Sequence, residues 1–281
     1  MPARTDPCPP PAATPCTAAY RAFAQVFPDL RIHQPAAARP HDGWVPTRRL
    51  LADPALRARL IATEARHCRV RYGAAPRPDV AAGFWLHRYS WPLGLLFTLP
   101  WFLQGRVPLP APGQLASRRG PGGGGPAELA LLPTPGPARF ACLPEDPAAD
   151  RPGAHPVPDH AALRAVLRST LAAHLEPVQA AFRPDLRRGP RTLWGLATDE
   201  VVEGLWYAAV LLGEEARAVA ALTELLPEDG GAAPFGAAGF RLRRPSGTGA
   251  APTPARTRAS CCLFYTLQPA ELCAGCPRTV D

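Results

Sequence analysis

Residues 77–104 read RPDVAAGFWLHRYSWPLGLLFTLPWFLQ and form the most apolar stretch of the chain. Its uninterrupted apolar part, from Trp91 to Leu103, is shorter than the ~20 residues that a membrane-spanning helix needs. Pro92 and Pro100 interrupt this part. The stretch therefore predicts a helix that is buried in the core and kinked at its prolines. Its tryptophans leave open a peripheral contact with a membrane surface.

Amphipathic patterns on both sides of this stretch predict further helices. They cover residues 17–26, 54–66, 159–182, 190–212 and 214–226. Asp159 is the expected N-cap of one of them, and Pro190 is the expected first residue of the next. His174 falls on the apolar side of the 159–182 helix, which predicts a hydrogen-bonded core histidine.

Two short strand-like runs lie between the two groups of helices, at residues 128–132 and 139–143. The sequence PTPGP separates them, and the pattern predicts a small β-hairpin. The expected fold class is therefore mainly α-helical (α+β), with a small β-hairpin and a C-terminal segment rich in cysteine. The glycine run of residues 121–126 predicts a loop rather than a phosphate cradle, because no Lys-Ser/Thr pair follows it.

The distribution of Pro and Gly, 38 and 24 residues, predicts three parts of the chain. Residues 1–16 are a disordered lead, residues 17–255 a helical body with Gly/Pro-rich loops, and residues 256–281 a C-terminal segment. Cys8 and Cys16 fall in the lead, where free thiols without a role are expected. Cys68 and Cys142 are expected to be buried thiols inside the body.

All 31 basic residues are arginine, and they give the chain a formal net charge of +8. A basic surface suits an acidic protein, an anionic ligand or an anionic membrane. Nucleic acid is not an expected partner, because the chain has no compact basic helix and no motif of interleaved Arg and aromatic residues. The N-terminal residues show no export signal, so we expect a cytoplasmic protein, with membrane association as an alternative. Thiols stay reduced in that compartment.

The C-terminal stretch from residue 256 to residue 281 reads RTRASCCLFYTLQPAELCAGCPRTVD and holds Cys261, Cys262, Cys273 and Cys276, half of all the cysteines. A C-x2-C turn presents two sulfurs to one metal centre, and the stretch before it can bring the adjacent pair back to that centre. Four thiolates are the ligand set of an iron–sulfur cluster or of structural zinc. Adjacent cysteines favour a cluster with two irons, while zinc and free or disulfide-bonded thiols stay open as alternatives.

The run Arg258-Ala259-Ser260-Cys261-Cys262-Leu263-Phe264-Tyr265, closed by Cys273-Ala274-Gly275-Cys276-Pro277, resembles the C-terminal signature of the FhuF-type ferric siderophore reductases. The aromatic stretch FWLHRYSWPLGLLF and the start Leu193-Trp194-Gly195 add a looser similarity. The resemblance implies that the four cysteines bind a [2Fe–2S] cluster. It also implies reduction of iron in siderophores of the hydroxamate type.

Such a reaction needs one-electron transfer and no nucleophile or general base, so we expect no catalytic residue beyond the cluster. The chain lacks a nucleotide or flavin fingerprint, so electrons are expected from an external donor such as a ferredoxin or flavodoxin. Arg258 and Arg278 are candidate docking residues for such an acidic donor. The alternative function is a zinc or iron–sulfur protein that acts as a redox or iron sensor or as an interaction module.

Overall fold

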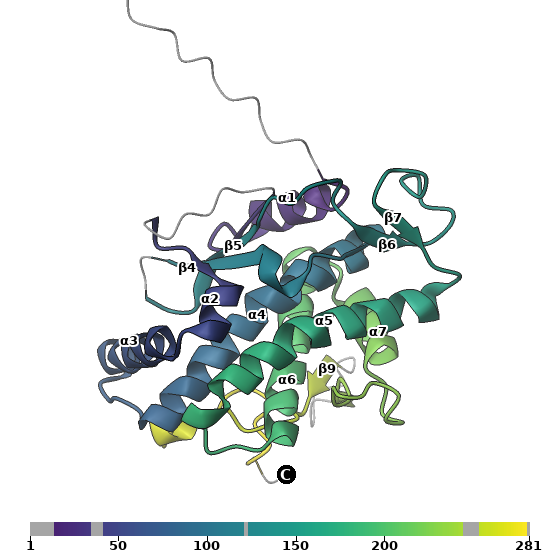
Figure 1. The fold of residues 1–281 in the computed structure, drawn as a ribbon. Coiled ribbons are helices and arrows are strands. Elements are labelled where there is room, and N and C mark those ends of the chain that lie inside the picture. The colour runs from purple at the N-terminus through teal and green to yellow at the C-terminus, as the bar shows by residue number, and fades with distance from the viewer. Residues whose placement is uncertain (1–13, 35–41, 121–122, 244–252, 280–281) are drawn as a thin grey trace, which may run out of the picture.

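The computed structural model describes residues 14–34, 42–120, 123–243 and 253–279. This part of the chain folds into seven α-helices and three small sheets (Figure 1). The helix α4 (Pro78–Gln104) lies at the centre. Four other helices pack against it, and their bounds are α1 (Thr17–Val26), α3 (Pro54–Tyr72), α5 (His160–Phe182) and α6 (Pro190–Leu211). The short α2 (Thr47–Ala52) and α7 (Glu215–Leu225) complete the set, which confirms a mainly α fold with some β structure.

The central helix α4 corresponds to the apolar stretch and continues through Pro92 and Pro100. Most of its side chains are buried on all sides, as expected of a core helix. Its Trp85 ring stacks on Phe182 of α5 at a centroid distance of 4.4 Å. In the described ranges, no helix combines the length and the hydropathy required to cross a membrane.

Helix α3 is longer than the 54–66 pattern predicts, since it continues to Tyr72. The Asp53 side chain accepts a hydrogen bond from the Leu56 N–H and caps its start. After Pro54, the first residue of the helix, no Gly or Pro occurs until Gly73, which ends the helix at a positive φ of 76°. His67 and Cys68 therefore lie within the helix, and the Cys68 thiol is buried as predicted.

The first sheet has the strand order β1-β5-β4-β2, and the second has the order β3-β6-β7. Their strands are β1 (Arg31–His33), β2 (Val45–Pro46), β3 (Val107–Pro108), β4 (Leu115–Arg119), β5 (Pro126–Leu131), β6 (Phe140–Cys142) and β7 (Ala154–Pro156). The third sheet pairs β8 (Phe240–Arg243) with β9 (Thr253–Arg256). Short 3-10 turns occur at Pro112–Gln114, Arg183–Asp185 and Phe264–Thr266.

The predicted pairing of residues 128–132 with 139–143 is wrong. Both runs form strands, but β5 pairs with β4 and β1, whereas β6 pairs with β3 and β7 in another sheet. Three prolines in residues 133–137 lack the N–H groups that a tight hairpin uses, so this linker carries the chain away. The hairpin of the first sheet is β4–β5 instead, joined through the glycine run.

The predicted helices of the second half are confirmed. Asp159 accepts a hydrogen bond from the Ala162 N–H at the start of α5, and α6 begins at Pro190. His174 is buried, with Nε2 3.0 Å from the Pro110 carbonyl oxygen, as expected of a core histidine.

The expectation for Cys16 is wrong, because this residue lies at the N-cap of α1 and is only 3% exposed. It packs with apolar residues of α1 and α4, so its thiol does not belong to a tail. Cys8 lies outside the described residues. Cys142 is buried in β6, as predicted.

Candidate metal centre

Residues 257–279, here called the cysteine segment, follow β9 and cover one end of the helical body. Figure 1 shows them in yellow, beside the end of α3 and the first turns of α4 and α6. The Gln268 side chain donates a hydrogen bond to the Tyr72 carbonyl at the end of α3. Leu267 is buried with Val80 and Phe84 of α4. These two helices therefore supply the apolar cover that the leucines and aromatic residues of the segment need.

The buried Asp199 of α6 holds the start of the cysteine segment. Its carboxylate accepts hydrogen bonds from the N–H groups of Ala259 at 2.7 Å and Ser260 at 2.9 Å. The Arg256 guanidinium lies 2.7 Å from the same carboxylate. Burial raises the pKa of Asp199, while Arg256 and the two N–H groups oppose this rise. The carboxylate thus joins α6 to the residues immediately before the first cysteine.

A glycine lets the segment come close to α6. Gly195 lies one turn before Asp199, and a Cβ atom there would be 3.1 Å from Ser260 Cβ and 3.3 Å from the Ala259 carbonyl oxygen. A larger residue would push the segment outward. This close contact gives a physical reason for glycine in the Leu193-Trp194-Gly195 start of α6.

The structure brings two of the four predicted ligands together. Cys262 Sγ lies 3.7 Å from Cys273 Sγ, across the loop that contains Leu263. Leu263 has a positive φ of 67°, a strained conformation for a residue with a side chain, and it turns the chain directly after Cys262. Burial, followed by the neighbouring Cys262 thiol, raises the pKa of Cys273 to about 12. A bound metal would be needed to keep this sulfur as a thiolate at neutral pH.

The other two predicted ligands lie apart from this pair. Cys261 is half-buried, and its carbonyl accepts a hydrogen bond from Arg188. Cys276 is buried, directly after Gly275, whose carbonyl accepts a hydrogen bond from the Arg258 N–H. Across the residues with described positions, no group of three or more His, Cys, Asp or Glu side chains is arranged to hold a metal ion.

The surroundings of the pair fit a sulfur-rich ligand group. Arg258 lies beside Cys273, with Nη2 3.1 Å from Glu200 Oε1, and its side chain is 9% exposed. Its Nε is buried without a hydrogen-bond partner. A buried N–H donor next to two cysteines fits an acceptor such as a cluster sulfide, because N–H···S bonds are a usual part of iron–sulfur sites. The four cysteines of the segment supply the donor set that such a group needs.

The two candidate docking arginines have different environments. Arg258 points into the protein and pairs with Glu200, so it does not offer a free charge to a partner. Arg278 is exposed, and its guanidinium lies 4.3 Å from the centroid of the Tyr265 ring. Of the two, only Arg278 presents its charge on the surface.

A cavity of about 510 Å³ adjoins the cysteine pair. Cys262 and Cys273 form part of its wall, together with side chains of α3, α4 and α6. The rest of the lining is Tyr72, Phe84, His87, Arg88, Trp91, Pro92, Gly125, Pro126, Glu200, Arg258 and Phe264. Sequence patterns do not reveal this cavity, because its wall combines segments that are far apart in the chain.

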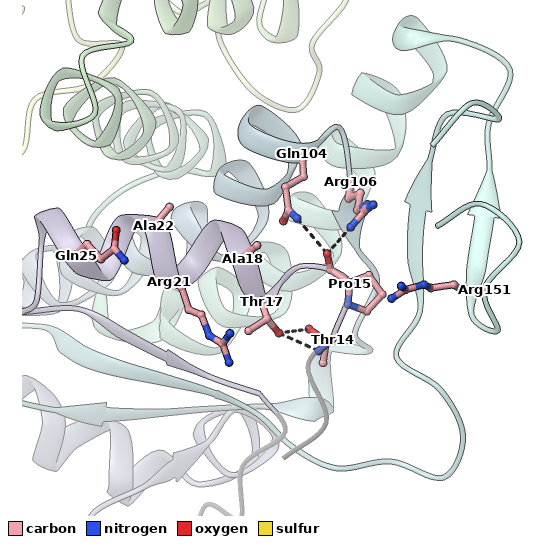
Figure 2. Close-up of a pocket in the computed structure, with 10 residues that line it drawn as sticks. All are labelled: Thr14, Pro15, Thr17, Ala18, Arg21, Ala22, Gln25, Gln104, Arg106 and Arg151. Carbon is pink, nitrogen blue, oxygen red and sulfur yellow. Dashed lines mark hydrogen bonds between the residues drawn. The ribbon is translucent and has the colours of Figure 1, made fainter. Parts of the chain in front are cut away.

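Other cavities lie away from the cysteine segment. One of about 430 Å³ is lined by α1, the end of α4 and Arg151 (Figure 2). Figure 2 shows Gln104 and Arg106 donating hydrogen bonds to the Pro15 carbonyl, so these groups hold the entry to α1. A larger cavity, about 1020 Å³, lies along the proline-rich residues 132–139. Neither contains a cysteine of the cysteine segment.

The comparison with protein families agrees with this centre. Four cysteine thiolates are the usual ligand set of a [2Fe–2S] or [4Fe–4S] cluster. Residues 258–278 match the family described as FhuF 2Fe-2S C-terminal domain. The match includes all four cysteines of the segment, confirms the resemblance to the FhuF-type family and indicates a [2Fe–2S] cofactor. The match also supports the assignment of the chain to an iron–sulfur family of the siderophore-iron reductase type. No curated protein matches the sequence.

Proposed function

We propose that the protein reduces ferric iron in siderophore complexes, one electron at a time, and that it releases Fe(II) in the cytoplasm. The proposed substrates are complexes of the hydroxamate type. The observation that carries this proposal is the FhuF-type cysteine segment, whose Cys262 and Cys273 lie in the wall of a cavity large enough for a small-molecule ligand.

The chemistry of the substrate explains why one electron is enough. Hydroxamate oxygens are hard ligands that hold Fe(III) much more tightly than Fe(II). When the ferric ion gains an electron, its bonds to these oxygens weaken. Protons then take the place of the metal on the oxygens, and Fe(II) leaves. The protein therefore needs a bound electron carrier and a place for the chelate, and no nucleophile.

The residues of the chain have three tasks in this proposal. Cys261, Cys262, Cys273 and Cys276 would hold the [2Fe–2S] cluster, which supplies single electrons when bound. The Asp199 carboxylate keeps the segment against α6. Arg258, neutralised by Glu200, places an N–H donor beside the cysteines.

We propose that electrons arrive from an acidic ferredoxin or flavodoxin. The net charge of +8 favours the approach of such a donor. Arg278 is the candidate contact, because its guanidinium is exposed over Tyr265 within the cysteine segment.

Anaerobic purification followed by electron paramagnetic resonance tests the cofactor, and stopped-flow mixing tests the reaction. The cluster-containing protein, once reduced, is mixed with a ferric trihydroxamate, and Fe(II) is trapped with ferrozine. We expect reoxidation of the protein together with one Fe(II) for each electron. A reduced protein that yields no Fe(II) from any ferric siderophore would overturn the proposed function.

A further inference from the structure

We propose that an acidic electron-donor protein of the ferredoxin type docks over the end of α3. The docking face, here called the arginine surface, consists of Arg66, Arg69, Val70, Arg71 and Arg278. The inference rests on the proposed function, which requires such a donor, and it goes further because it names where the donor binds. Apart from Arg278, the residues of this surface belong to α3 and lie outside the matched residues 258–278.

The last turns of α3 expose a face that combines positive charge with a large apolar side chain. Arg66, Arg69 and Val70 have the i, i+3, i+4 spacing that places residues on one side of a helix. All three are exposed, and Val70 is 88% exposed, more than any other large hydrophobic residue in the described part of the chain. Figure 1 shows α3 at the edge of the molecule. Since protein interfaces combine apolar contact with arginine, this face suits a protein partner.

The charges of the arginine surface are available to an acidic partner. Within the described ranges of the chain, no carboxylate forms an ion pair with any of its four arginines. Arg66 donates a hydrogen bond to the Thr63 hydroxyl, which leaves its charge uncompensated. The cysteine segment has one exposed acidic residue with a described position, Glu271, so positive charge prevails. Such a surface attracts acidic proteins and raises their rate of association.

Contacts between rings connect the arginine surface to the cysteine segment. The Arg71 guanidinium carbon lies 6.0 Å from the centroid of the Tyr72 ring, and this ring meets the Phe264 ring edge to face at 5.2 Å. The next residue, Tyr265, has the Arg278 guanidinium carbon 4.3 Å from its centroid. The end of α3 and the cysteine segment therefore form one continuous face.

The arginine surface also lies close to a predicted ligand of the cluster. Phe264 follows Cys262 by two residues, and both line the same cavity as Tyr72. None of the four arginines lines this cavity, so the docking face is distinct from it. Electron transfer slows steeply with distance, so a donor has to dock near the cluster. In this step the donor loses one electron and the protein gains it, and no bond forms or breaks.

Stopped-flow mixing of the cluster-containing protein with a reduced, acidic [2Fe–2S] ferredoxin tests the docking face. The α3 triple variant, Arg66→Gln with Arg69→Gln and Arg71→Gln, should slow electron transfer about tenfold at low salt. Its rate should also depend less on salt than the wild-type rate, because fewer charges attract the donor.

A second triple variant is the matched control. Arg183→Gln with Arg187→Gln and Arg191→Gln removes the same charge from exposed arginines at the junction of α5 and α6. This junction also reaches the cysteine segment, because Arg188 donates a hydrogen bond to the Cys261 carbonyl. The control therefore separates a local docking face from the effect of net charge, and its rate should change by less than about twofold.

Val70→Asp tests the apolar part of the surface. The new carboxylate would face an acidic donor, so the rate should fall about tenfold. Because Val70 is 88% exposed, the substitution should leave the fold intact. Val210→Asp, at a 48% exposed valine in the last turn of α6, is the control and should keep the wild-type rate. The visible spectrum of each variant verifies that the cluster is retained.

The outcomes separate the docking face from the reaction. Absence of electron transfer from the ferredoxin, an unchanged rate in the α3 triple variant, equal slowing in both triple variants, or a wild-type rate in Val70→Asp would overturn the docking face. Fe(II) release from a ferric trihydroxamate by dithionite-reduced protein needs no donor, so it should be as fast in the α3 triple variant as in the wild type. Ferredoxin oxidation that depends on the α3 arginines, without any Fe(II) release, would remove the proposed function and leave the docking face.

Discussion

The Asp199 carboxylate accepts a hydrogen bond from the Ser260 N–H at 2.9 Å, one residue before the first cysteine. This contact joins the middle of the chain to its C-terminal segment. It determines where the cysteines begin relative to the helical body, and it involves none of their side chains.

Asp199→Asn should destabilise the protein and shorten the lifetime of the cluster. The amide would keep one acceptor but place an NH2 group against Arg256 or an N–H, so a buried charge pair is broken at a cost of about 3 kcal/mol. Loss of visible absorbance over time and chemical unfolding measure the two effects. Asp146→Asn is the matched control, because Asp146 also binds an arginine and a backbone N–H. Asp146→Asn should lower the free energy of unfolding but leave the lifetime of the cluster as in the wild type.

Each of the four cysteines of the cysteine segment should be required for the cluster. Replacement of Cys261, Cys262, Cys273 or Cys276 by serine should reduce iron content and the signal of the reduced protein in electron paramagnetic resonance. Cys16→Ser, in a buried thiol outside the segment, should keep both. Equal loss of iron in Cys16→Ser and Cys273→Ser would show that the ligand assignment is wrong.

His174 should make the fold sensitive to acid. Burial lowers the pKa of His174 to about 4 from 6.5, despite its contact with the Pro110 carbonyl. In the unfolded chain the His174 imidazole takes up a proton near pH 6.5, whereas in the folded chain it stays neutral down to about pH 4. The free energy of unfolding is therefore highest above pH 6.5 and falls as the pH drops toward 4. The shift corresponds to roughly 3 kcal/mol.

Urea unfolding of the wild type and of His174→Gln between pH 7.5 and pH 4 measures this loss as a difference in the free energy of unfolding. In His174→Gln the free energy of unfolding should depend less steeply on pH, because glutamine binds no proton. His160→Gln, on the exposed first turn of the same helix, is the control. An identical pH dependence in wild type and His174→Gln would exclude this histidine as the cause.

Arg278→Gln should slow electron transfer from an acidic donor by about twofold and flatten its dependence on salt. Attraction between exposed charges is screened over ~8 Å at physiological ionic strength, so the wild-type rate should fall as salt rises. Stopped-flow oxidation of the reduced donor provides the rate. Arg139→Gln, next to β6 at the far end of the molecule from the cysteine segment, is the control (Figure 1). A salt dependence that is unchanged in Arg278→Gln would place the donor elsewhere.

Gly125→Ala should destabilise the protein by about 1–3 kcal/mol, because the new methyl group would overlap Arg88 in its backbone and Cβ. Thermal unfolding measures the change. Gly113→Ala is the control, since a Cβ there has no neighbour within 4 Å. Equal melting temperatures for the two variants would mean that the glycine run moves freely away from α4.

Helices were predictable where their signals are local. The N-cap Asp159, the proline at the start of α6 and the apolar stripe of α5 all lie within the helices that they define. The end of α3 was missed because arginines there dilute the apolar pattern. Strand pairing was mispredicted because β5 was paired with the strand-like run that follows it. Its partners are instead β4, which precedes it, and β1, which is distant in the chain.

The same distinction applies to the candidate site. The four cysteines could be predicted as ligands from the sequence because they lie close together in the chain, from Cys261 to Cys276. Asp199 and Glu200 gave a weaker signal: two adjacent carboxylates in a mostly apolar helix that also contains Glu203. Their partners Arg256 and Arg258 lie beyond α7 and β8 in the chain, so only tertiary packing shows that the four charges neutralise one another.

The hydrogen bonds that Asp199 accepts from the chain before Cys261 also affect the order of folding and cluster assembly. Its three donors are two backbone N–H groups and a guanidinium, none of which needs iron. The cysteine segment can therefore dock during folding, ahead of any inorganic assembly, unlike a zinc finger that is unfolded without its metal. Damage by oxygen would then remove the inorganic centre and leave a folded recipient, and repair would consist of reloading rather than new synthesis.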